Sequence, residues 1–429
     1  MTNLVKLAIT AKGPLALLNR TGGIVRRYGW TPAKMDRALD RFVRILREFD
    51  CGATFPITAI ALHRHSESVQ KYRSHGIEFA VHGYRHVDHS QLSEIEQRAH
   101  LAQARQIFVQ AGLQPEGFRS PYLRWNSDTL AAIKSHGFAY DSSQALAWDG
   151  VDDHRETDAY RRVKRFYGAV AAADYPALPR LENGVVRIPY CIPDDEALID
   201  RLRLTEIEPM AEIWLRILRR TYQLGELFTL GLHPERIALC EGALRAVLAE
   251  ARSLSPAVWI AQLGEIATWW RSRTETSYQL TQETENSYRL TVNGPAGTTI
   301  LARCVAVQAA TEARADGFLR VMSDEFAFQA QKLPFIGLSP DSPAALISFL
   351  RQQGYLVERG AHAQSCALYL NYTEFAPADE RSLLAKLAGD DRPLLRFGRW
   401  PGGAQSALAV TGDIDALTLR DYGLRMFGG

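Results

Sequence analysis

The stretch "ALAVTGDIDALTL", residues 407–419, decides the fold, and it comes only ten residues before the end of the sequence. Its first half is apolar with small and branched side chains, a pattern that predicts a buried β-strand. Asp413 and Asp415 follow one residue apart, and a turn into a helix comes next. Because alternate residues of a strand project to the same face, both carboxylates are expected on one side of the strand's end. Paired acids at such a place are typical of the start of a catalytic domain, although an Asx turn that closes a strand would give the same pattern.

Upstream of this stretch, strand and helix patterns alternate from residue 31 to about residue 272. That alternation predicts parallel βα units in an α/β sheet or barrel. The composition changes near residue 274 to Thr, Tyr and Val with a turn at "NGPAG", which predicts antiparallel hairpins, and mixed helix and strand patterns return before residue 400. We therefore expect three parts: a barrel over 1–273, a β-rich and then mixed α/β accessory module over 274–400, and a strand and helix over 401–429 that return to the barrel.

The composition is that of a globular protein with a full-sized core. Of 429 residues, 46% are hydrophobic and 23% charged, and 50 basic against 48 acidic side chains leave a net charge of +2. No bulk charge therefore points to nucleic acid or to an anionic membrane. No apolar run approaches the ~20 residues needed to cross a bilayer, the first residues do not predict a secretion signal, and the five cysteines are scattered. We expect a reduced, cytoplasmic protein, and a homo-oligomer is left open.

The strongest local signal for a metal site is "FAVHGYRHVDH", residues 79–89. His82 ends a predicted strand and His86 follows four residues later, so both imidazoles can face one cation. Two surface or capping histidines would give the same spacing. A carboxylate from another strand would complete a set of two histidines and one acid, and Asp413 and Asp415 are the best-placed pair, one as ligand and the other as base.

Two further strand ends carry candidate catalytic groups. "FTLGLHPER" places His233 at the end of an apolar strand, where it could act as a general acid. "GFRSPY" places Arg119 before a proline turn, where it could pair with a carboxylate, and a backbone N–H beyond Pro121 could serve an oxyanion. A turn histidine and a surface arginine are the plainer interpretations of the same residues.

The order of these motifs resembles that of the polysaccharide deacetylase family, the metal-dependent carbohydrate esterases with a distorted (β/α)7 barrel. The "ATF" strand stands at 53–55, the H-x-x-x-H motif at 82–86, and the R-x-P-Y motif at 119–122. "YDSSQALAW", residues 140–148, loosely resembles the family's aspartate-aromatic segment, and Leu232-His233 resembles its leucine-histidine pair. The resemblance covers about residues 31–272 and implies that barrel as the fold.

The family's first motif, a strand with two aspartates, is missing from the N-terminal side. "LVKLAITAKGP", residues 4–14, takes its place but has Ala11 and Lys12 instead of acids, whereas "RWPGGAQSALAVTGDIDAL", residues 399–417, resembles the missing motif. We therefore expect a circularly permuted barrel, in which the C-terminal strand pairs beside residues 53–58. Two alternatives stay open: the tail is a remnant of a second, truncated domain, or it belongs to a dimer partner's barrel by domain swapping.

The resemblance implies a hydrolase that removes an N- or O-acetyl group from a sugar or glycan precursor. Asp415, His82 and His86 would hold a divalent metal, with Zn²⁺ preferred and Co, Ni or Mn as alternatives. Asp413 would be the general base.

The remaining roles also follow from the resemblance. His233 would protonate the leaving group, the backbone N–H of Tyr122 would meet the oxyanion, Arg119 would orient the base, and Asp141 would tune His233. Two other functions stay open: an allantoinase-like cyclic-amide hydrolase, and an inactive carbohydrate-binding protein that uses the β-rich region with Tyr278 and Tyr288.

Overall fold

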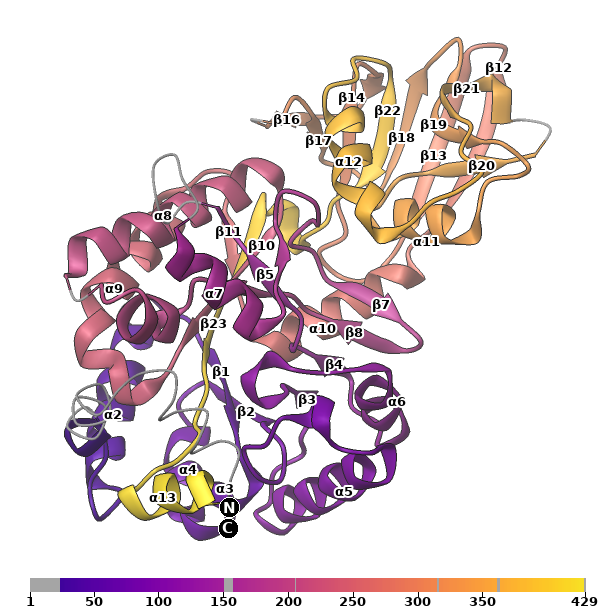
Figure 1. The fold of residues 1–429 in the computed structure, drawn as a ribbon. Coiled ribbons are helices and arrows are strands. Elements are labelled where there is room, and N and C mark those ends of the chain that lie inside the picture. The colour runs from indigo at the N-terminus through magenta and orange to yellow at the C-terminus, as the bar shows by residue number, and fades with distance from the viewer. Residues whose placement is uncertain (1–23, 150–156, 205, 315, 361–362, 428–429) are drawn as a thin grey trace.

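The structure is a computed structural model that describes residues 24–149, 157–204, 206–314, 316–360 and 363–427. The N-terminal stretch 4–14, which was considered above for the missing aspartate motif, lies outside these residues. The architecture is mixed α/β, with one large curled sheet and a second region of smaller sheets (Figure 1).

The large sheet has twelve strands, in the spatial order β6-β5-β9-β10-β23-β1-β2-β3-β4-β8-β7, with β11 pairing on β23. Among the described strands of this sheet, β7 and β8 are the pair that is antiparallel. The pairing forms an open path from β6 to β7 among the described residues, so the sheet curls but does not close into the hydrogen-bonded ring that the word barrel implies. The strands are β1 (Ala53–Ile57), β2 (Ile77–Val81), β3 (Gly117–Phe118), β4 (Tyr140–Asp141), β5 (Ala145–Ala147), β6 (Val170–Ala171), β7 (Arg180–Glu182), β8 (Val185–Arg187), β9 (Tyr190–Ile192), β10 (Leu227–Leu232), β11 (Val258–Ile260) and β23 (Ser406–Gly412).

Helices alternate with these strands and cover the sheet (Figure 1). The helix over residues 33–48, for example, buries Met35, Leu39 and Phe42 at helical spacing. The helices are α2 (Ala33–Glu48), α3 (Ala59–Arg64), α4 (Ser66–Arg73), α5 (Glu94–Gln110), α6 (Ser127–Ser135), α7 (Asp158–Tyr167), α8 (Ile207–Leu224), α9 (Ile237–Ser253), α10 (Leu263–Ser272) and α13 (Leu419–Phe427).

Strand β23 lies in the middle of the large sheet although it comes last in the sequence. It pairs in parallel with β10 from Leu227–Ala407 to Leu232–Gly412, and with β1 at Thr54–Thr411. Every residue of β23 is buried, as expected for a parallel strand covered on both faces. The aspartates that follow β23 are thereby placed beside the residues that follow β1 and β10.

The second region, residues 277–397, forms its own sheets. Two are antiparallel, in the orders β12-β13-β18-β15 and β16-β17-β14-β22, and a parallel one has the order β20-β19-β21. Its elements are β12 (Ser277–Thr284), β13 (Ser287–Asn293), β14 (Ile300–Arg303), β15 (Ala306–Gln308), β16 (Thr311–Ala313), β17 (Leu319–Val321), β18 (Glu325–Gln329), β19 (Leu333–Leu338), α11 (Ala344–Gln352), β20 (Val357–Arg359), β21 (Cys366–Leu370), α12 (Glu380–Ala388) and β22 (Leu394–Phe397). Figure 1 shows this region at the end of the molecule opposite α13.

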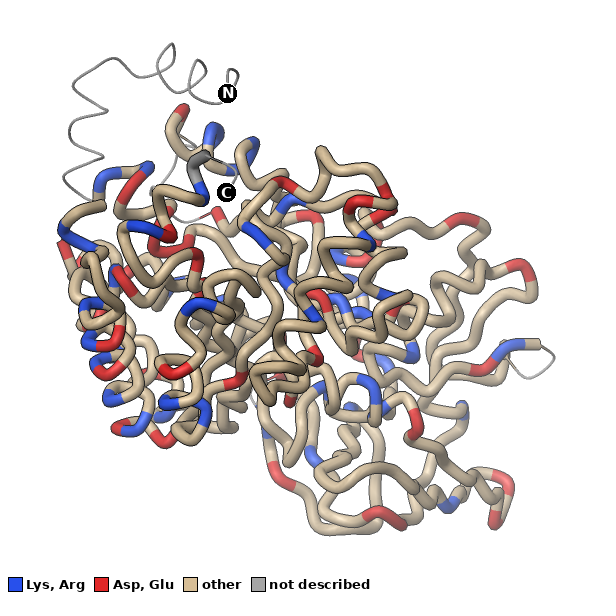
Figure 2. The backbone as a smooth tube through the Cα atoms, turned by 90° about the horizontal axis from the view of Figure 1, so that it is seen from below, with Lys and Arg blue, Asp and Glu red and all other residues tan. Residues whose placement is uncertain are grey.

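Charges of both signs alternate over the backbone, without a single-sign face in the view of Figure 2. Among the described helices, none is long and apolar enough to cross a membrane.

Candidate metal centre and catalytic site

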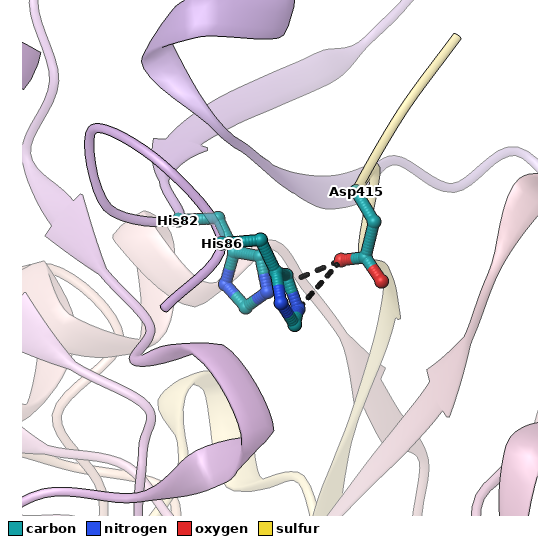
Figure 3. Close-up of side chains that lie close together, drawn as sticks. All are labelled: His82, His86 and Asp415. Carbon is teal, nitrogen blue, oxygen red and sulfur yellow. Dashed lines mark ion pairs between the residues drawn. The ribbon is translucent and has the colours of Figure 1, made fainter. Parts of the chain in front are cut away.

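Three side chains from distant parts of the sequence meet at the carboxyl edge of the large sheet (Figure 3). His82 directly follows β2, His86 lies in the next loop, and Asp415 follows β23. Oδ1 of Asp415 lies 3.4 Å from Nε2 of His82 and 3.2 Å from Nε2 of His86. Gly83, with φ of +79°, gives the chain the turn between the two histidines that a residue with a Cβ would adopt only with strain. The structure thus brings together the three residues that the sequence analysis selected as ligands.

The ligand atoms of this set lie close enough together to face one cation. Nδ1 of His82 donates a hydrogen bond to the Arg119 carbonyl at 2.8 Å, which leaves the Nε2 lone pair facing Asp415. Oδ1 of Asp415 is buried and has no hydrogen-bond partner among the described residues. Burial and the nearby Arg425 guanidinium lower the pKa of His86 to about 4, so its ring is neutral at pH 7. Two imidazoles and a carboxylate are a donor set that suits Zn²⁺ and related cations.

Asp413 is held by a buried arginine beside the three candidate ligands. Its Oδ1 accepts a hydrogen bond from Nη1 of Arg119 at 2.5 Å, and its Oδ2 lies 4.0 Å from Nε2 of His82. Arg119 is fully buried, donates to Thr411 and Ser142 as well, and lies over the ring of Tyr190 at 4.6 Å. The guanidinium therefore fixes one oxygen of Asp413 and leaves the other facing the site.

His233 has a different carboxylate partner from the one expected. Its Nδ1 lies 2.6 Å from Oδ1 of Asp195, and its backbone N–H donates to Oδ2 of the same residue at 2.7 Å. Burial lowers the pKa of His233, but the Asp195 carboxylate more than offsets this, and the pKa is raised well above its ordinary value. The ring is thus protonated at neutral pH, as a general acid must be.

The expected pairing of Asp141 with His233 is wrong. Asp141 ends β4, and the strands β23, β1, β2 and β3 lie between β4 and β10, the strand that His233 follows. It pairs instead with Arg187 at 2.9 Å and accepts a hydrogen bond from Ser143. Asp195 follows β9, the strand next to β10, and "IPDDE" directly after an apolar strand is the sequence signal that could have identified it.

One small pocket joins these groups, and part of its wall was not anticipated. The side chains that were predicted and do line it are His82, His86, Tyr122, His233, Asp413 and Asp415. The lining residues that the sequence analysis missed are Leu123, Tyr167, Tyr190, Asp194, Glu196 and Arg425. For a water-sized sphere the pocket has a volume of about 20 Å³, which is room for about one water molecule.

Two features of the wall bear on its chemistry. Asp194 accepts a hydrogen bond from the Tyr190 hydroxyl at 2.9 Å, and burial together with repulsion from Asp195 raises its pKa to about 6. Tyr122 has a left-handed backbone, with φ of +58°, and its ring meets that of His86 edge-on with centroids 4.4 Å apart. Its backbone N–H as an oxyanion donor stays a prediction.

The class that this fold and site define is an α/β protein that gathers imidazoles and carboxylates at the carboxyl edge of a curled, mainly parallel sheet. Residues 29–140 match the family model described as polysaccharide deacetylase. The peptidoglycan deacetylase-like protein FGM2 of Gibberella zeae is 38% identical over 69 residues, which cover 16% of this chain and 20% of that protein. The similarity to this family is carried by residues 29–140. The chain spans about a fifth of the length of that curated relative.

Solved structures similar to this chain include a Mycobacterium smegmatis protein described as a polysaccharide deacetylase, with 24% identity and a TM-score of 0.43 over 58% of this chain and 81% of that one. The allantoinase PuuE matches with 22% identity and a TM-score of 0.43, over 55% of this chain and 72% of its own. A pseudoenzyme of carbohydrate esterase family 4 from Bacillus anthracis matches with 14% identity and a TM-score of 0.27, over 42% and 57%.

Proposed function

We propose that this protein is a metal-dependent hydrolase that removes an acetyl group from nitrogen or oxygen of a sugar or glycan precursor. The observation that carries the proposal is the meeting of His82, His86 and Asp415: Oδ1 of Asp415 lies 3.4 and 3.2 Å from the two Nε2 atoms and is buried without a hydrogen-bond partner among the described residues. The family match over residues 29–140 supports the acetylated carbohydrate as the substrate class.

His82, His86 and Asp415 would hold the divalent cation, with Zn²⁺ favoured by the two imidazoles. When bound, such a cation would polarise the acyl carbonyl and make water a better nucleophile. The fit rests on the lone pairs of both Nε2 atoms and on the unpartnered Oδ1, all of which face one point.

The proton transfers fall to this chain's own residues. Asp413 is the base that takes a proton from water, because Arg119 holds its Oδ1 and leaves Oδ2 toward the site. His233 is the acid that protonates the leaving atom from Nε2, because Asp195 holds its Nδ1. A base and an acid that are each held in place by a partner are what general acid and base catalysis requires.

We also propose that the chain is a circular permutation of the family's usual order. The support is the place of β23 between β1 and β10, together with the resemblance of residues 399–417 to the aspartate strand that comes first in the family. In this proposal the second region is an insertion between α10 and β23.

The test combines metal analysis with an acetyl-ester and acetyl-amide assay on purified variants. Asp415→Ala and His82→Ala should lose stoichiometric metal, whereas Asp413→Asn should keep the metal and lower kcat about 10²- to 10⁴-fold. Asp174→Asn, an exposed aspartate in the loop before β7, is the matched control and should change neither. Full metal occupancy in Asp415→Ala would refute the ligand set, and metal without turnover on any acetylated sugar would refute the reaction.

A further inference from the structure

The C-terminal helix α13 places a guanidinium group directly against the candidate metal ligands. Arg425 contacts Oδ2 of Asp415 with Nη1 at 2.5 Å, and its Nη2 lies 3.2 Å from Nε2 of His86. The same side chain lines the pocket that also contains Asp413 and His233. Figure 1 shows α13 at the end of β23 that carries the aspartates.

The contact with His86 uses the atom that a metal would need. A neutral imidazole has one lone pair, and a single nitrogen cannot offer it to a guanidinium and to a cation at the same time. Nε2 is the His86 atom that lies near Asp415, at 3.2 Å, whereas Nδ1 is buried and has no hydrogen-bond partner among the described residues. The contact with Asp415, in contrast, uses Oδ2 and leaves Oδ1 free.

The guanidinium of Arg425 has the same sign of charge as a metal cation. Arg425 lies beside the Asp415 carboxylate, which a divalent cation would otherwise neutralise. The guanidinium carries a fixed positive charge and a forked set of donors that match a carboxylate and a lone pair. Among the residues that line the pocket, it is the one with a permanent positive charge.

The first turn of α13 is held independently of this contact. Asp421 accepts from the backbone and the hydroxyl of Thr418, and it pairs with His65 at 2.8 Å and with Arg64 at 3.2 Å. The backbone N–H of Leu419 donates to Gly29 at 2.8 Å. The helix can therefore stay anchored at Asp421 while the Arg425 side chain leaves the ligands.

We propose that Arg425 competes with the metal for His86 and Asp415, so that the bound cation and this guanidinium contact exclude one another. This inference rests on the proposed metal site and concerns its occupancy: Arg425 keeps the ligands together and compensates their charge when no cation is bound, and it sets how tightly a cation binds.

The experiment measures Zn²⁺ affinity by competition with a chromophoric chelator, for wild type, Arg425→Ala and Arg420→Ala. Arg420 is an exposed arginine of the same helix and serves as the matched control. We expect Arg425→Ala to bind Zn²⁺ about tenfold or more tightly than wild type, because charge-assisted hydrogen bonds to the ligands are lost, and Arg420→Ala to bind like wild type. Free guanidinium at millimolar concentration should weaken Zn²⁺ binding by Arg425→Ala but not by wild type, with NaCl of equal ionic strength as the reference.

The outcomes separate this inference from the metal site itself. Equal or weaker Zn²⁺ binding in a folded Arg425→Ala, while wild type binds, would overturn the competition and leave the metal site standing. If Arg425→Ala does not fold, the Zn²⁺ affinity of Arg425→Gln tests the competition instead, since glutamine keeps much of the side-chain length but removes the charge. Absence of Zn²⁺ binding in wild type and in every Arg425 variant would overturn the metal site, and the competition with it.

Discussion

Asp195 determines the protonation state of His233 and gives the sharpest test at the scale of single residues. Replacing it by Asn removes the negative charge that raises the pKa of His233 and leaves the effect of burial, so this pKa should fall. The acid form of His233 is lost as pH rises through its pKa. We therefore expect the alkaline limb of the rate profile to move to lower pH in Asp195→Asn, by about one unit or more.

Asp141→Asn is the control for this prediction, because Asp141 is equally buried and pairs with Arg187 instead. It should lower the stability of the protein without moving the alkaline limb of kcat/KM. A shift of that limb in Asp141→Asn but not in Asp195→Asn would restore the pairing of Asp141 with His233 that the family resemblance implied.

The site residues that could be predicted from the sequence are those that belong to a short sequence pattern. The spacing of His82 and His86 and the pair Asp413 and Asp415 are visible within a few letters, and each falls at a strand end. Asp195 was missed because its partner depends on which strands are neighbours, and that order is set by long-range pairing.

Arg425 was missed for a different reason: an arginine on a polar helix has no pattern that distinguishes a site residue from a surface one. Only the place of α13 next to the ends of β2 and β23 reveals its role.

At the scale of elements, the anchoring of α13 by Asp421 predicts a pH dependence of stability. Burial alone would raise the pKa of Asp421, but hydrogen bonds from His65 and Thr418 lower it to about 2, below the ordinary value of 3.8. Because the folded pKa is the lower one, its contribution to stability is present above pH 3.8 and is lost as pH falls toward 2.

Asp421→Asn should therefore lower the free energy of unfolding by about 2 kcal/mol at pH 6, and the difference from wild type should narrow at pH 3. Urea unfolding at both pH values measures it, with Asp174→Asn as the reference variant. A difference that is constant with pH would assign the effect to lost packing rather than to the charge of Asp421.

The element pattern itself was largely predictable from periodicity. The strands near 53–58, 77–82 and 227–232, the buried strand at 407–412 and the antiparallel hairpins after 274 all follow from local alternation. The open path of the large sheet did not follow, because the strands at its two ends, β6 and β7, are set by long-range pairing and not by local alternation. A closed barrel was expected from the family resemblance, whereas the pairing gives a curled sheet.

At the scale of the whole molecule, the second region shares a hydrophobic core with the large sheet. Tyr140, Leu227 and Trp270 from the first region pack in one cluster with Ile336 and Leu350 from the second. The contact lies toward the start of β10 and β23, whereas the candidate site lies after their ends. Among the described residues that line the pocket, none comes from 274–400. The change of composition at residue 274 predicts a domain boundary. It does not predict on which side of the large sheet the second region lies.

The aspartates after β23 can complete the site of their own chain or, in a swapped dimer, the site of a partner chain. Mixing two inactive variants distinguishes these two arrangements. The pairing of β23 with β1 and β10 within one chain favours the first arrangement. His82→Ala and Asp415→Ala each lack one ligand. If every site is built from one chain, a mixture of the two, unfolded and refolded together, contains no complete site.

We therefore expect such a mixture to bind no more metal than either variant alone. In a swapped dimer, each site would combine His82 of one chain with Asp415 of the other, so a mixed dimer would carry one complete and one doubly defective site. Random pairing would make half of the dimers mixed and return about a quarter of the wild-type sites. Refolded wild type gives the reference number of metal sites. Recovery of about a quarter of these sites, in proportion to the product of the two variants' concentrations, would show that the strand is exchanged between chains.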